Sequence, residues 1–198
     1  GKGKVFSDST AIKPLFNSKK CIVTSQGIYP NYSNLDAYKM AACCIDTAVR
    51  NLVVTGCNLS NIALLDNFCW CSPEESEKIY QLKEALKACY DLSTKFCTPF
   101  ISGKDSMYND FNGYDKKNRN IKISILPTLL ISSVGIINDY NDLLSIVPRK
   151  FGDLIFIIGK TNSEMCGSEY EKVFGYENGS IPKVDKDIAK RNYNNFIK

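Results

Sequence analysis

Segments with helical periodicity alternate with short apolar runs along most of this chain. Apolar runs at residues 21–27 and 61–68 predict short strands. Between and after them, residues 35–56 and 73–97 carry apolar side chains at the spacing of one helix face. Strands interleaved with helices are typical of a sheet covered by helices. The alternation therefore predicts an α/β or α+β fold, with a mixed sheet packed on two long helices.

The first predicted helix has recognisable ends. Asn34 or Asp36 is expected to cap its start, and Gly56 is expected to end it. Its apolar positions recur three or four residues apart. These positions are Met40, Cys44, Ala48 and Leu52.

The second predicted helix begins with a strong start signal. Ser72 can act as the cap, Pro73 fits the first helical turn, and two glutamates follow. The helix is expected to run to about Cys97. The side chains expected on its core face are Ile79, Leu82, Leu86, Cys89 and Phe96.

The next segments are shorter. Residues 98–102 predict a strand that leads into a polar stretch, and residues 110–120 predict a polar, mobile loop. Residues 121–137 predict one or two strands, because Pro127 breaks or bends the run. Residues 141–148 predict a short helical turn.

The end of the chain predicts the start of a second domain. A surface turn around 140–149 separates a first domain, 1–140, from a truncated α/β segment, 150–198. Within that segment, residues 152–161 predict a buried strand ending in glycine, and residues 184–198 predict a helix.

Composition narrows the functional classes. The chain has 198 residues, 44% hydrophobic and 23% charged, with a net charge of +4, which is ordinary for a globular protein. Its lysines are scattered, so no nucleic-acid partner is expected. No run approaches the ~18 apolar residues of a membrane span, and no apolar signal region opens the sequence. A cytoplasmic protein without membrane contact is the expectation.

The cysteine and histidine content limits the chemistry. There are nine cysteines, none in a C-x-x-C pair, and no histidine. This pattern favours buried free thiols in a reducing compartment over a zinc site. General acid–base chemistry would have to use a carboxylate, lysine, tyrosine or cysteine. No residue of the chain is assigned a catalytic role.

Three local motifs have both a functional and a structural interpretation. Gly159-Lys160-Thr161 fails the P-loop pattern, because Leu154 stands where a glycine is required, so a turn is expected. Asp66-Asn67 ends an apolar strand, where it can meet a ligand or start a turn.

The stretch ISGKDS, residues 101–106, also follows a predicted strand. Gly103 permits close backbone approach to a phosphate, and Lys104 offers a positive charge. A solvated polar loop is the alternative.

Two pairs in the first helix share faces by their spacing of four residues. Asp46 and Arg50 predict an ordinary surface ion pair. Thr47 and Asn51 share another face, where the amide of Asn51 is a weak candidate for a magnesium ligand.

Five runs taken together resemble one known family. They match it in order and spacing, from about Ser7 to the end of the chain. The runs are AVRNLVVTG, ALLDNFCW, CYDLSTKFCTPFISGKDSMYND, ISILPTLLISSVGII and CGSEY. The chain resembles the phosphoribosylformylglycinamidine synthases, which belong to the aminoimidazole ribonucleotide synthetase-like superfamily.

The resemblance implies an architecture and a reaction. The synthetase portion of this family is an internal duplication, and each half has an N-terminal and a C-terminal α/β domain. The N-terminal domains pair through their sheets into a central barrel. ATP activates an amide oxygen, and ammonia from glutamine turns the amide into an amidine. The chain is similar to the N-terminal domain of the second half plus the start of the next domain.

The resemblance also implies a metal site. Asp8 matches an aspartate that the family places near magnesium, and Asn51 matches a second metal-side residue. Thr47 stands where the family has a glutamate, so one carboxylate of the expected set is missing.

Nucleotide-binding residues follow from the same resemblance. Asp66 and Gly103 match nucleotide-contacting positions, and Ser106 matches a position that contacts substrate or phosphate. Lys104 replaces an asparagine found in some members. A protonated lysine cannot bind magnesium, so Lys104 is expected to face phosphate itself.

Two functions follow for a chain of this kind. The first is a part of the ATP-dependent amidotransferase, with magnesium and Lys104 offsetting triphosphate charge. The second is a structural half that holds nucleotide without turning it over. A related ATP enzyme, such as aminoimidazole ribonucleotide synthetase, fits the motifs less well.

The expected partners are other parts of the same system. They are the remainder of the synthetase, a glutaminase domain or subunit, and a second copy of the chain paired through an exposed apolar sheet face. Alone, the chain is expected to be inactive.

Overall fold

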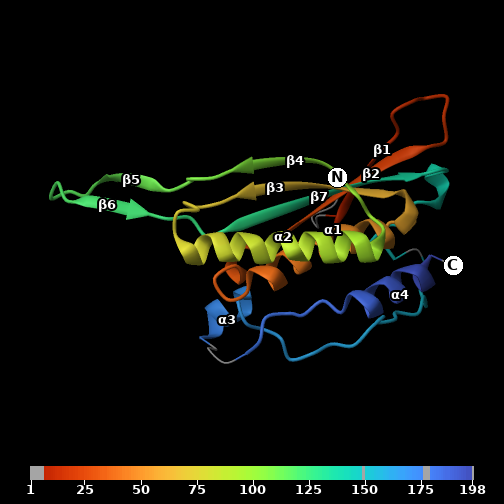
Figure 1. Ribbon diagram of the computed structural model, residues 1–198. Helices are drawn as coiled ribbons and strands as arrows, with labels where there is room; N and C mark the ends of the chain where they lie inside the picture. The colour runs from red at the N-terminus through yellow and green to blue at the C-terminus, as the bar shows by residue number, and fades with distance from the viewer. Residues whose placement is uncertain (1–6, 149, 176–178, 198) are drawn as a thin grey trace.

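A five-stranded mixed sheet forms the frame of the protein. The computed structural model describes residues 7–148, 150–175 and 179–197. The strand order is β1-β2-β7-β3-β4; β3 and β4 run parallel, and the other neighbours run antiparallel. The strands are β1 (Ser9–Ile12), β2 (Cys21–Ile28), β3 (Ile62–Cys69), β4 (Phe100–Ser106) and β7 (Thr128–Ile137). The expected mixed sheet is confirmed (Figure 1).

Helix α1 (Ala37–Val54) packs directly on the sheet. The side chain of Asp36 caps it by accepting a hydrogen bond from the Lys39 N–H, and Thr55 and Gly56 end it, as predicted. All four apolar positions expected on its inner face are buried. The helix lies so close to β2 that a Cβ on Gly27 would stand 2.1 Å from the carbonyl oxygen of Cys44. Glycine at this position is therefore required by the packing.

Helix α2 (Ser76–Phe96) packs beside α1 and starts later than predicted. Residues 72–75 form a turn in which the Ser72 hydroxyl accepts from the Glu74 N–H. The predicted core face is also partly wrong, since Ile79 and Leu86 are 47% and 50% exposed. The buried stripe instead contains Gln81, Ala85, Ala88, Cys89, Leu92 and Phe96. Small alanines on this stripe let α2 approach α1 closely.

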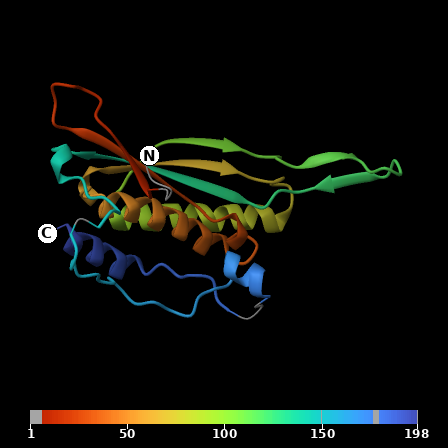
Figure 2. The same ribbon diagram turned by 180° about the vertical axis from the view of Figure 1, so that it is seen from behind.

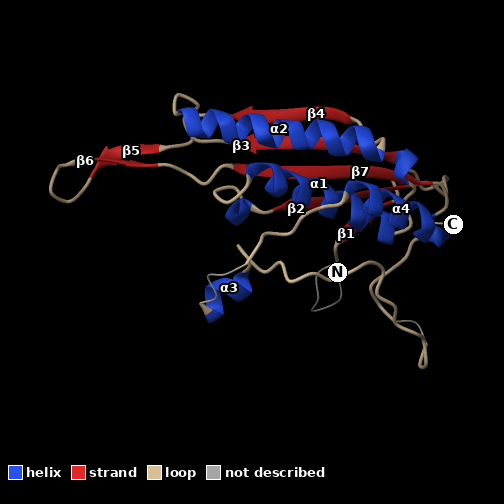
Figure 3. Cartoon of the chain, turned by 60° about the horizontal axis from the view of Figure 1, so that its bottom comes forward, coloured by secondary structure: helices blue, strands red, loops and turns tan. Residues whose placement is uncertain are grey.

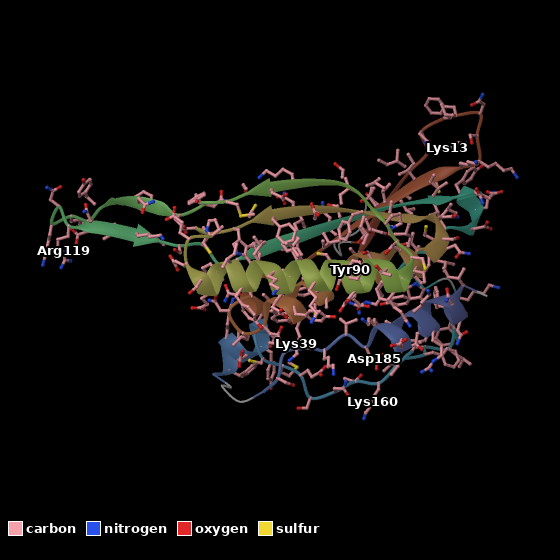
Figure 4. The ribbon with its side chains drawn as sticks, in the orientation of Figure 1. Lys13, Lys39, Tyr90, Arg119, Lys160 and Asp185 are labelled. Carbon is pink, nitrogen blue, oxygen red and sulfur yellow. The ribbon has the colours of Figure 1, made fainter. Side chains whose placement is uncertain are left out.

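A hairpin extends beyond the main sheet where a polar loop was predicted. Strands β5 (Phe111–Tyr114) and β6 (Asn120–Ile123) pair antiparallel, and Figure 4 shows Arg119 at their tip. The Asp115 carboxylate accepts from the N–H groups of Lys117 and Arg119, which fixes the turn. Pro127 separates β6 from β7, so of the one or two strands expected for residues 121–137, two form.

The C-terminal segment forms a third layer beneath α1 and α2 (Figures 2 and 3). It contains α3 (Glu169–Phe174) and α4 (Lys186–Phe196), and the latter confirms the predicted last helix. Short 3-10 turns occur at η1 (Pro30–Tyr32), η2 (Leu59–Asn61) and η3 (Tyr140–Asp142). The proposed domain boundary around 140–149 stays a prediction.

The predicted buried strand at 152–161 is wrong. Residues 154–158 have no regular structure, and all five side chains are at least 60% exposed. A strand needs a neighbour for its backbone hydrogen bonds, and no described strand pairs with this run. The prediction was wrong because it used apolar composition alone, which does not show whether a neighbouring strand is present.

A buried polar cluster joins α4 to α1. The Tyr193 hydroxyl donates to the Asp46 carboxylate, which also binds the Arg50 guanidinium at 2.8 Å. The expected Asp46–Arg50 pair is present, but Asp46 is buried rather than on the surface. Burial raises the pKa of Asp46, and the neighbouring Arg50 opposes that rise. Through Tyr193, the Asp46–Arg50 pair therefore helps to hold α4 against α1.

Most of the thiols are buried, as expected from the cysteine pattern. Six of the nine cysteines are buried and free, and only Cys97 is exposed. None of the helices in the described ranges is long and apolar enough to cross a membrane.

Candidate functional site: the open face of the sheet

The two faces of the main sheet differ in their cover. Helices α1 and α2 lie on one face, and no described element lies over the other (Figures 1 and 2). We call this second surface the open face. Across it, the strand register places four side chains in one row, in the order Ile28, Leu130, Asn67 and Lys104. The open face is therefore where sheet residues can meet a ligand or another protein surface.

Asp66 lies on the opposite, helix-covered side. It pairs with Gly103 across β3 and β4, and a Cβ on Gly103 would stand 2.0 Å from its Oδ1. Burial and the neighbouring Asp105 raise the pKa of Asp66, and the backbone N–H of Lys104 opposes that rise. The close approach of the Asp66 carboxylate explains why position 103 is glycine: the carboxylate occupies the space of a side chain.

The structure does not bring Asp66 and Lys104 together. Lys104 pairs with Asn67, one residue further along both strands, so its side chain points to the open face. A phosphate group cannot touch both side chains through the sheet. The nucleotide role of Asp66 stays a prediction, and the structure provides no shared site for it with Lys104.

Lys104 belongs to a polar cluster at the end of β4. Its Nζ donates to Ser106 Oγ at 3.0 Å, and Asn109 Nδ2 donates to the same hydroxyl at 3.0 Å. Ser106 in turn donates to the carbonyl oxygen of Phe68 at 3.3 Å. Lys104 and Ser106 thus lie together, within an exposed strand rather than in a polar stretch after one.

Asp8 and Asn51 are in contact toward the other edge of the sheet, beside β1 and β2. Asn51 Nδ2 donates to the backbone oxygen of Asp8 at 3.3 Å and to Ser25 Oγ at 3.1 Å. Beside them is a polar cavity of about 520 Å³ over β1, β2 and β7. Its lining consists of Ser7, Asp8, Ser9, Thr10, Thr24, Ser25, Gln26, Leu65, Ser132, Ser133 and Val134.

The metal-ligand set in this region is small. Asn51 donates from Nδ2 to Asp8, so its Oδ1 is the atom that could bind magnesium. Thr47 accepts from Arg50 and shares a hydrogen bond with Tyr29, so a cation lies where the family has a carboxylate. Among the described residues, no three metal-binding side chains gather. The metal role of Asp8 and Asn51 stays a prediction, in which each gives one oxygen contact to an ion carried by substrate phosphates.

The two groups of predicted site residues lie in different places on the sheet. The backbone oxygen of Asp8 accepts from Ser25 on β2, and Asp8 lines the polar cavity together with Leu65 on β3. Lys104 lies on the edge strand β4 and is not among the residues that line this cavity.

Sequence reasoning missed several polar residues of this face. Thr24, Gln26 and Ser132 line the cavity, and Asn109 donates to Ser106. Polar side chains inside otherwise apolar strands were the available signal. Asn109 had no such signal, because its contacts depend on the turn that follows β4.

A second cavity, of about 750 Å³, lies between α1 and the C-terminal segment. Gly159 and Lys160 are among its lining residues, and Figure 4 shows Lys160 on the extended segment below the helices. Gly159 has a positive φ of 105°, typical of a turn and consistent with the failed P-loop pattern.

Comparisons with known proteins agree with the resemblance. The PurL subunit of phosphoribosylformylglycinamidine synthase from Thermoplasma acidophilum is 31% identical over 185 residues, 93% of this chain and 23% of that subunit. The PurL subunit from Pyrococcus furiosus is 33% identical over 199 residues, 96% of this chain and 26% of that subunit. The chain thus spans about a quarter of these relatives.

Solved structures show the same fold. PurL from Thermotoga maritima complexed with AMPPCP has a TM-score of 0.55 at 17% identity, covering 67% of this chain and 20% of that one. The same protein complexed with FGAR has a TM-score of 0.53 at 16% identity, covering 67% and 19%.

The family comparison covers most of the main sheet and both long helices. The family described as AIR synthase related protein, N-terminal domain, matches residues 7–128. This range includes β1 to β6 and excludes most of β7. The chain therefore belongs to the AIR synthase related family, whose N-terminal domain its residues 7–128 represent.

Proposed function

We propose that this chain is part of an ATP-dependent phosphoribosylformylglycinamidine synthase of purine synthesis. One observation carries the proposal: the chain matches PurL subunits over more than nine tenths of its own length while spanning about a quarter of theirs. Within that enzyme it would form the N-terminal domain of the second half and the start of the next domain.

In this proposal the open face receives the nucleotide. Lys104 neutralises a phosphate group as a point cation, and its effect grows once a partner surface excludes water. Asp8 provides one carboxylate contact to a magnesium ion that arrives with the phosphates. The metal would supply further charge neutralisation.

The rest of the enzyme supplies the remaining chemistry. Its substrates would be ATP and formylglycinamide ribonucleotide, and its ammonia would come from glutamine through a glutaminase domain or subunit. The open face, which carries Leu65, Leu130 and Val134, would pair with the other half or with a second copy. The complete protein would be cytoplasmic, and this chain alone inactive.

A second candidate function is a half that holds nucleotide without turning it over. The observation that favours it is Thr47, whose hydroxyl contacts Arg50 and Tyr29 where the family has a carboxylate. Losing a carboxylate weakens metal-assisted phosphoryl transfer more than it weakens phosphate binding.

Single-turnover ATP hydrolysis by the complete synthetase separates the two functions. We expect Lys104→Ala to slow the chemical step about tenfold or more in a catalytic half. Lys83→Ala is the matched control, because Lys83 is exposed on α2, away from the open face. An unchanged rate with a lower unfolding temperature would indicate the structural, nucleotide-holding half instead.

A further inference from the structure

We infer that Ser106 and Asn109 are positioning residues that hold the Lys104 ammonium ready for a phosphate group. The inference rests on the proposed function and goes beyond it, because it assigns Ser106 a role other than direct substrate contact. It follows from the hydrogen bonds at the end of β4.

The Ser106 hydroxyl is engaged within the protein on every side. A serine hydroxyl can accept two hydrogen bonds and donate one. Lys104 Nζ and Asn109 Nδ2 each lie 3.0 Å from it, and neither nitrogen can accept. Its one proton has two acceptors in the protein, the carbonyl oxygen of Phe68 at 3.3 Å and the Cys69 sulfur at 3.7 Å. A phosphate oxygen needs a donor and would have to compete with both for that proton.

Asn109 fixes the hydroxyl from the other side. Its Nδ2 also donates to the carbonyl oxygens of Ser106, at 2.8 Å, and Trp70, at 3.1 Å. Its backbone N–H binds the same Trp70 oxygen at 3.0 Å. Asn109 thereby ties the end of β4 to the end of β3.

The backbone before Asn109 is arranged for this contact. Tyr108 has a φ of 57°, a left-handed conformation that is uncommon for a residue other than glycine. This turn brings Asn109 back toward Trp70 and Ser106. Strained backbone of this kind persists where the surrounding contacts fix it, and here the side-chain amide and the backbone N–H of Asn109 do so.

Lys104 is the cation that the cluster presents. An ammonium has three N–H donors, and among the described residues Ser106 takes one of them. Two donors remain for the oxygens of a phosphate group on the open face. Holding a long, flexible side chain in one place lowers the entropy that binding would otherwise cost.

The test measures the ADP dissociation constant of the complete synthetase by calorimetry. We expect Lys104→Ala and Ser106→Ala each to weaken ADP binding, by about tenfold and about fivefold. Asn109→Ala is expected to act in the same direction, and Ser106→Thr is expected to restore binding because it keeps the hydroxyl. Ser60→Ala, an exposed serine at the other end of β3, is the control and should leave ADP affinity unchanged.

A double-mutant cycle separates positioning from direct contact. If Ser106 acts through Lys104, Ser106→Ala should change ADP affinity less than about twofold when Lys104 is already alanine. An additive, fivefold loss in that background would overturn the inference and show direct ligand contact. If Lys104→Ala alone leaves ADP affinity unchanged, the proposed nucleotide site itself is wrong. Thermal unfolding of each variant identifies a loss caused by misfolding, and Ser106→Thr supplies the folded comparison.

Discussion

The two faces of the main sheet differ in how deeply their side chains are buried. On β7, Leu129 and Ile131 point to the helices and are 0% exposed, whereas Leu130 and Ser132, beside them in sequence, point to the open face and are only partly buried. The helix-covered side thus contains the stabilising core. The open face contains the lysine cluster and the wall of the polar cavity, so substitutions there are expected to cost less stability than substitutions under the helices.

The first prediction concerns the thiols of the helix-covered side. Burial raises the pKa of Cys43 to about 12, of Cys57 to about 11 and of Cys89 to about 12. In the unfolded chain these thiols ionise near their ordinary pKa of 9.0. Stability is therefore fully present below about pH 9 and is lost as the pH rises toward 11 and 12, by about 1.4 kcal/mol per pH unit for each thiol.

Denaturant unfolding at about pH 8 and about pH 10.5 measures this loss. Cys57→Ala should flatten the pH dependence, because it removes one titrating group. Cys97→Ala should not, since Cys97 is exposed. Equal free energies of unfolding at the two pH values would contradict the prediction.

The second prediction uses two adjacent leucines of β7. Leu129→Ala should lower the free energy of unfolding by about 2–5 kcal/mol, because it leaves a cavity under α1. Leu130→Ala should cost only about 1 kcal/mol, because its side chain is partly exposed on the open face. Chemical denaturation of both variants makes the comparison. Equal costs would remove the distinction between the two faces.

The third prediction concerns the contact between Gly103 and Asp66. Gly103→Ala should destabilise the chain by about 1–3 kcal/mol, since the new methyl group would collide with the Asp66 carboxylate. In an Asp66→Ala background the cost should fall to a few tenths of a kcal/mol, about the value of an ordinary surface change. Thermal unfolding measures both, and an unchanged cost in the double variant would show that another contact requires the glycine.

The elements with clear local signals were predicted well. Asp36 as the cap of α1, Gly56 after its end and Pro127 between two strands are each found where the sequence placed them. These features depend on local backbone preferences, which can be inferred from the residue types alone.

The errors came from contacts between distant residues. The run at 152–161 is apolar but lacks a paired strand, and residues 110–120 look polar but form most of a paired hairpin. For the site, the resemblance assigned Asp66 and Lys104 to contacts with the same nucleotide. Which side of the sheet each occupies depends on the register of β3 against β4, and one residue of shift reverses it.

Acetylation of lysines in the complete synthetase tests the central claim most directly. Mass spectrometry would compare modification rates with and without saturating ATP. We expect ATP to slow acetylation of Lys104 at least about fivefold, because a bound phosphate covers its ammonium. The rates at Lys83 on α2 and Lys160 in the C-terminal segment should stay the same. An unchanged rate at Lys104, with protection at Lys160 instead, would contradict nucleotide binding on the open face.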